Sequence, residues 1–96
     1  MIRVRFTEKR LTLLGHAGYA EKGQDIVCAA ASALVYALIG TLEDADNVSE
    51  LVIRPGHVTV AAKKDDPAFT VVRRGLAQLA GRYPGYVAVE QGRKDD

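Results

Sequence analysis

Apolar and polar residues alternate in the first segment of the chain. Ile2, Val4 and Phe6 are apolar with polar residues between them, and a second apolar segment follows at residues 11–14. A period of two is typical of a strand with one buried face, because successive side chains of a strand point to opposite faces. The chain is therefore predicted to begin with a hairpin of two strands.

A glycine-rich segment and a long apolar run follow this hairpin. Residues 15–24 contain three glycines with charged residues between them, which predicts a flexible loop. Asp25 is a suitable N-cap for a helix over residues 26–42. This helix has apolar or small residues on every side, so more than one of its faces must be covered. We therefore predict a homodimer, in which a second copy of the chain covers one face.

The second half of the chain predicts another hairpin. Its strands are residues 51–53 and 58–62, and Pro55 and Gly56 between them suit the two central positions of a type II turn.

A second helix and a last strand complete the predicted domain. Asp66 followed by Pro67 is typical of a helix start, and apolar residues then recur three and four positions apart as far as Tyr83. Residues 86–89 predict a fifth strand. The order ββαββαβ predicts an α+β fold, an α/β sandwich with a mixed five-stranded sheet and two helices, as a single domain over residues 1–96.

Composition and charge are those of an ordinary globular domain. The 96 residues are 48% hydrophobic and 26% charged, with a net charge of +1. These values exclude a disordered tail and a strongly basic nucleic-acid-binding protein, so we expect no direct nucleic-acid partner. One cysteine and two histidines exclude an internal disulfide and a cysteine-rich zinc site. We expect neither a metal nor a cofactor.

The sequence indicates a cytoplasmic protein with a reduced thiol. Its first residues carry charges within the apolar stretch and lack the pattern of a signal peptide. The uncharged run at residues 26–42 is at the lower limit for a membrane-spanning helix, but it is rich in alanine and its flanks are acidic. We therefore expect no membrane partner.

The predicted topology brings chemically useful side chains to one edge of the sheet. If the first helix connects two parallel strands, His16 lies near Cys28. The turn of the second hairpin, with Arg54 and His57, lies at the same edge. Either histidine can therefore pair with the cysteine.

Cys28 lies in the first turn of the first predicted helix. Free N–H groups and the helix dipole stabilise an anion there, which favours the nucleophilic thiolate. A nearby histidine can accept the thiol proton, and the same N–H groups can bind the oxyanion of a tetrahedral intermediate. These are the parts of a cysteine hydrolase, although a single cysteine among alanines is more often a small core residue.

Two polar residues share a helix face with Cys28. Asp25 is expected to cap the helix, and it can also orient His16 in a triad. Ser32 can donate to the thiolate or to a substrate carbonyl, or it can bond to the carbonyl four residues earlier, as serines within helices commonly do.

Two sequence blocks around these residues resemble the signature of the bacterial ribosomal-processing cysteine protease family Prp. The first is GHAGYA at residues 15–20 and the second is GQDIVCAAASAL at residues 23–34. Their content and separation match the family, as do the Asp25 and Ser32 positions. The order of elements and YPGYV at residues 83–87 extend the resemblance over nearly the whole chain.

The resemblance implies a peptidase that removes a short N-terminal extension from a bacterial large-subunit ribosomal protein, on the carboxyl side of an aromatic residue. It assigns Cys28 as the nucleophile and His16 as its base. It also implies that the glycine-rich loop orders over bound peptide, and the loop residues expected to contact substrate are Gly15, Gly18, Tyr19, Gly23 and Gln24. Tyr19, Tyr83 and Tyr86 are candidates for lining a pocket for the aromatic residue, although tyrosines beside a turn more often pack against their neighbours.

Two other functions remain open. A non-catalytic ribosome-assembly or RNA-binding module would use four basic residues that are more often a solvated face: Lys63, Lys64, Arg73 and Arg74. A degenerate homologue would bind the ribosomal protein without cutting it, but the presence of both Cys28 and His16 argues against this.

Overall fold

Seven elements follow one another in the computed structural model, which describes residues 1–21 and 23–92. They are β1 (Ile2–Phe6), β2 (Arg10–Leu14), α1 (Ile26–Asp44), β3 (Glu50–Arg54), β4 (His57–Ala61), α2 (Ala68–Arg82) and β5 (Val87–Gln91). The predicted order ββαββαβ is confirmed, and the element bounds lie close to the predicted ones.

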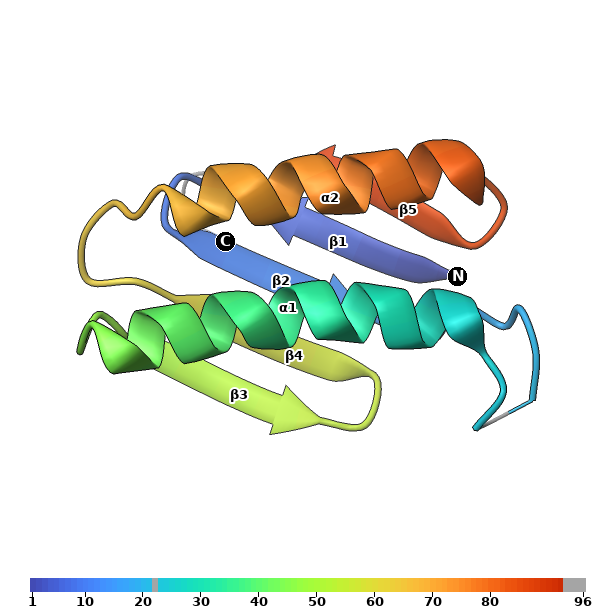
Figure 1. The fold of residues 1–96 in the computed structure, drawn as a ribbon, viewed down its shortest axis with the longest axis horizontal. Coiled ribbons are helices and arrows are strands. Elements are labelled where there is room, and N and C mark those ends of the chain that lie inside the picture. Colours follow the sequence, from blue (N-terminus) through green and yellow to red (C-terminus); the bar gives the residue numbers. More distant parts are fainter. Residues whose placement is uncertain (22, 93–96) are drawn as a thin grey trace.

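The five strands form one mixed sheet in the order β3-β4-β2-β1-β5. β1 pairs with β2, β2 with β4, and β4 with β3, all antiparallel, whereas β1 and β5 are parallel. β2 and β3 therefore run in the same direction, as the predicted crossover requires, but β4 lies between them. As a result the end of β2, the start of α1 and the β3–β4 turn all lie at one edge of the sheet (Figure 1).

Both helices cover the same face of the sheet (Figure 1). The alternation predicted for β1 is confirmed, because its three apolar residues are buried and the two arginines between them are exposed. The core joins strand residues such as Leu11 and Val60 to Leu38 of α1 and Leu76 of α2. Arg3 and Arg5 of β1 and Thr12 of β2 lie on the opposite face of the sheet.

α1 buries only part of its apolar surface. Its buried residues, which include Val35 and Leu38, face the sheet and α2, while Ile26 and Tyr36 are exposed. By length and composition alone α1 could also cross a membrane, a test that core helices of globular proteins pass as well. In this fold its buried residues belong to the domain core.

An aspartate side chain accepts backbone N–H groups near the start of each helix. Asp25 is the N-cap of α1, as predicted, and its side chain accepts two N–H groups of the first turn. α2 begins at Ala68 with Pro67 as its N-cap, so the expected start, with Asp66 as N-cap and Pro67 as the first helical residue, is wrong by one position. The Asp66 side chain still accepts the N–H of Ala68 at 2.8 Å.

Candidate active site

A backbone bond fixes the point at which the chain leaves β2. The N–H of Gly15 donates to the carbonyl of Gly56 in the β3–β4 turn at 2.8 Å. The next side chain, His16, lies against that turn, and a Cβ on Gly56 would come within 3.1 Å of its Nε2 atom. Gly56 has a φ of +70°, as expected at the third position of a type II turn. The backbone of the predicted turn therefore lies against one side of the His16 ring.

The half-buried Cys28 lies in the first turn of α1. Its Sγ atom accepts a hydrogen bond from the N–H of Ala17 at 3.2 Å. Ala17 is 3% exposed, although the residues on either side of it are exposed. The residue that follows His16 is therefore fixed against the cysteine sulfur.

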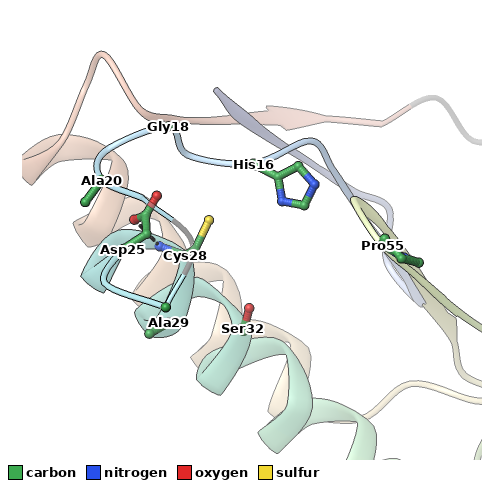
Figure 2. Close-up of a pocket in the computed structure, with 9 residues that line it drawn as sticks. His16, Gly18, Ala20, Asp25, Cys28, Ala29, Ser32 and Pro55 are labelled. Atoms are coloured by element: carbon green, nitrogen blue, oxygen red, sulfur yellow. Dashed lines mark hydrogen bonds between the residues drawn. The ribbon is translucent and has the colours of Figure 1, made fainter.

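The cysteine and the histidine face the same cavity, from α1 and from the segment after β2 (Figure 2). The cavity has a volume of about 570 Å³ and is lined by His16, Gly18, Ala20, Gly23, Asp25, Cys28, Ala29, Ser32 and Pro55. A second groove of about 320 Å³ shares His16, Cys28, Ser32 and Pro55 with it and extends to Tyr36 of α1 and Ile53 of β3. The predicted proximity of the two side chains is thus confirmed, with space beside them for a peptide.

The Asp25 carboxylate connects the start of α1 to the preceding segment. Oδ1 accepts the N–H groups of Val27 and Cys28, at 3.0 and 2.9 Å, and Oδ2 accepts that of Tyr19 at 3.0 Å. The bonds from the Cys28 and Tyr19 N–H groups, that of Cys28 first, hold the pKa of the Asp25 carboxyl below its ordinary value, against the opposing effect of desolvation. All three are bonds to backbone N–H groups, so the observed role of Asp25 is capping rather than contact with His16.

This cap changes the expected source of oxyanion donors. The sequence predicted that first-turn N–H groups of α1 bind the oxyanion. Those of Val27 and Cys28 donate to the Asp25 side chain, and that of Ala29 donates to the Asp25 carbonyl at 3.0 Å. Each of these three groups already has Asp25 as its acceptor, so it could bind an oxyanion only by leaving that bond, and the prediction stays a prediction.

Ser32 is exposed one turn after Cys28 and lines the same cavity (Figure 2). Within residues 1–21 and 23–92, the bond to the carbonyl four residues earlier is made in α1 by Thr41, to Ala37 at 2.9 Å, and not by Ser32. The commoner expectation for this serine is therefore wrong, and its hydroxyl faces the space beside the cysteine.

His57 belongs to a different hydrogen-bonded chain. Its Nε2 atom lies 3.2 Å from Thr59 Oγ1, which in turn lies 3.2 Å from Thr12 Oγ1. His57 lines the second groove together with His16 and Cys28, but of the two histidines only His16 also lines the cavity of 570 Å³ with Cys28. The geometry therefore favours His16 as the partner of the cysteine.

Only some of the loop residues expected to contact substrate line the cavity. Gly18 and Gly23 line the cavity. Gly15 is bonded to the β3–β4 turn, and Gln24 donates its N–H to the Glu21 carbonyl at 2.9 Å. The ring of Tyr19 packs against two other tyrosines, and none of the three lines the cavity.

Two contacts at the site were missed by the sequence analysis: the Ala17 N–H on the sulfur and the Gly56 backbone behind the imidazole. The sequence held a signal for the Gly56 contact, since the Pro55-Gly56 turn was expected at the same edge as His16. It held none for the Ala17 N–H, because any residue type can supply a backbone donor.

Comparisons with known proteins show the family to which the chain is related. The family model described as cysteine protease Prp matches residues 1–88. The ribosomal processing cysteine protease Prp of Mycoplasma pneumoniae is 34% identical over 100 residues that cover the whole of both chains. That of Mycoplasma genitalium is 33% identical over 98 residues, which cover 95% of this chain and 96% of the relative.

Solved structures share the fold. The ribosomal processing protease Prp of S. aureus, with a covalently linked product peptide, superposes with a TM-score of 0.80 over 95% of this chain and 97% of that chain, at 16% identity. A Streptococcus mutans protein superposes with a TM-score of 0.76 at 30% identity, over 95% of this chain and 93% of that chain. The family model matches most of the chain, and both Mycoplasma relatives exceed 30% identity over nearly its full length. The relationship predicted from the two sequence blocks is therefore confirmed, and the chain belongs to the Prp family of ribosomal-processing cysteine proteases.

Proposed function

We propose that the protein is an endopeptidase that removes the N-terminal extension of a bacterial large-subunit ribosomal protein, with Cys28 as nucleophile and His16 as base. The observation that best supports this proposal is that both side chains face one cavity in a chain of this family. The Mycoplasma relatives are named ribosomal processing proteases, and two S. aureus structures contain a substrate peptide or a covalently linked product peptide.

The proposed reaction is acyl transfer. His16 accepts the thiol proton, and Cys28 Sγ attacks the scissile carbonyl carbon to form a tetrahedral intermediate. When the intermediate collapses, the C–N bond breaks, His16 gives the proton to the leaving amine, and a thioester remains. Water, deprotonated by His16, then attacks the thioester and releases the new carboxylate and the thiol.

A backbone donor is available for the oxyanion of this reaction. The Ala17 N–H lies 3.2 Å from Sγ, and negative charge moves from sulfur to the carbonyl oxygen as the new bond forms. We assign this N–H to the oxyanion, with the Ser32 hydroxyl as a second donor. Gly15, Gly18, Tyr19, Gly23 and Gln24 remain the loop residues proposed to contact or order around the peptide.

The proposal includes a homodimer in the cytoplasm. Ile26 and Tyr36 on α1 are 57% and 50% exposed, and Ile53 on the neighbouring edge strand is 49% exposed. A second copy on this side of the domain would cover the face of α1 that its own core leaves bare. Cytoplasmic conditions would keep the Cys28 thiol reduced, as the mechanism requires.

The RNA-binding alternative has less support. Arg73 lies over the Phe6 ring at 5.0 Å and donates to the Thr7 carbonyl at 3.3 Å. Lys63 lies 3.6 Å from an Asp46 carboxylate oxygen. Two of the four basic residues therefore already have partners within the domain.

Cleavage of a peptide that spans the extension of the host's ribosomal protein tests the proposed function. Cys28→Ser and His16→Ala are expected to abolish turnover while the fold persists, because each removes one half of the proton-transfer pair. His57→Ala is the matched control and should retain turnover. Normal cleavage by Cys28→Ser would reject the mechanism, and selective inactivation by His57→Ala would make the hairpin histidine the base.

A further inference from the structure

Few bonds determine the path of the segment between His16 and the start of α1. Residues 15–21 and 23–25 contain no helix or strand. The Ala17 N–H bonds to Cys28, and the Tyr19 N–H bonds to Asp25, so both of these bonds join the segment to the start of α1. The bond from Gly15 to Gly56 fixes the β2 end of the segment, so a further contact outside α1 is needed to fix the path from Ala17 to Asp25.

The side chain of Tyr19 makes such a contact. Its ring meets the ring of Tyr83 at a centroid distance of 5.5 Å and that of Tyr86 at 5.2 Å. The interplanar angles are 78° and 77°, so both contacts are edge-to-face, the favourable geometry for aromatic pairs. The peptide between nucleophile and base is thus joined to the turn between α2 and β5.

That turn is well anchored in the domain. The Tyr83 N–H donates to Leu79 at 2.9 Å, and the Tyr86 N–H donates to the Tyr83 carbonyl at 2.9 Å. The Tyr86 carbonyl accepts the N–H of Ile2, the first residue of β1, at 2.8 Å. Both rings are half-buried and pack against the hydrophobic core. Tyr83 and Tyr86 therefore form a fixed platform for the ring of Tyr19.

We propose that Tyr19 is a positioning residue, and that Tyr83 and Tyr86 are the platform through which it acts. With its ring held on the platform, Tyr19 sets the path of the segment, which places the Ala17 N–H on Cys28 and the His16 ring across the cavity. This inference rests on the proposed function of Cys28 and His16. It differs from the expectation of a pocket for an aromatic substrate residue, because the Tyr19 ring is occupied by the other two.

The proposal predicts a separation of kcat from KM. Tyr19→Ala removes the ring contacts, so His16 and the Ala17 N–H lose their alignment with Cys28 and kcat falls by about tenfold or more. The KM for the extension peptide changes by less than about threefold, because no ring of the platform lines the cavity. Tyr19→Phe keeps the ring and restores kcat. Val71→Ala, at an exposed position of α2, is the control for an unrelated apolar truncation.

Amide hydrogen exchange gives a second readout that does not depend on catalysis. Tyr19→Ala, and Tyr86→Leu as a platform variant, should speed exchange at the Ala17 and Tyr19 amides in the folded protein. The double variant should be hardly worse in kcat than Tyr19→Ala alone, because both changes break the same contact. A wild-type kcat for Tyr19→Ala, a rise in KM alone, or unchanged exchange at both amides would overturn the proposal. A failed nucleophile assignment would be seen separately, as cleavage by Cys28→Ser with the exchange result unaffected.

Discussion

The imidazole of His16 rests on the backbone of Gly56, with its Nε2 atom 3.1 Å from the position that a Cβ would occupy. The two residues come from different strand connections, which the bond between Gly15 and Gly56 holds together. The absence of a side chain at residue 56 is therefore part of what places the base.

Gly56→Ala should impair catalysis. The new methyl group meets Nε2, and the φ of +70° is unfavourable for any residue with a Cβ, so the ring and the turn must both shift. We expect kcat to fall by about 10- to 100-fold in peptide cleavage. The control is Gly81→Ala in α2, where a Cβ meets nothing within 4 Å. It should keep full activity and gain about 0.5–1 kcal/mol of stability. A fully active Gly56→Ala would disprove the role of this contact.

Two aspartates at helix starts separate stability from activity. Asp25 accepts two N–H groups of the first turn of α1, and Asp66 accepts the Ala68 N–H at the start of α2, but only Asp25 also holds the Tyr19 N–H beside the site. Alanine at either position should lower the melting temperature. Asp25→Ala should in addition lower kcat, whereas Asp66→Ala should leave it unchanged when both are assayed well below their melting temperatures. Equal kcat values for the two variants would mean that the Asp25 bond to the loop has no catalytic effect.

Acid should remove the contribution of Asp25 to stability. Its folded-state pKa is below the ordinary value of 3.8, because N–H groups stabilise the charged form. The contribution is therefore complete above the unfolded pKa and is lost as the pH falls through the lowered one. The difference in melting temperature between the wild-type protein and Asp25→Asn should be constant near neutral pH and shrink in strong acid. A difference that persists in strong acid would contradict this assignment.

The proposed dimer predicts a change of mass. Ile53→Asp and Tyr36→Asp each place a charge on the exposed side of α1 and β3, and charge at the centre of an apolar interface is unfavourable. Light scattering at micromolar concentration should give a dimer for the wild-type protein and a monomer for these variants. Val71→Asp, equally apolar and exposed but on α2, should remain dimeric. A monomeric wild-type mass would rule the dimer out.

Local patterns in the sequence were sufficient to predict the helices and strands and the edge of the sheet at which the site lies. Asp25 at the start of an apolar run predicted α1, and the Pro55-Gly56 pair predicted the β3–β4 turn. The crossover from β2 to β3 then brought His16 to Cys28 without any knowledge of side-chain positions. These features depend on periodicity and turn chemistry, which are properties of neighbouring residues.

The use of individual donors at the site could not be predicted in this way. Asp25 was recognised as a cap, but its capture of the Val27 and Cys28 N–H groups depends on how its carboxylate is oriented. The bond from Ala17 to the sulfur depends on the path of a loop without regular structure. A shift of about an ångström makes or breaks such a hydrogen bond. The sequence pattern would be the same whether the bond forms or not.

β1 and its parallel neighbour β5 lie at opposite ends of the order of elements, and the tyrosine platform directly precedes β5. The surroundings of Cys28 and His16 therefore include a segment that follows them at a long distance in the sequence. A fragment that ended before Tyr83 would keep both residues but would lack the rings that contact Tyr19 and the strand that pairs with β1.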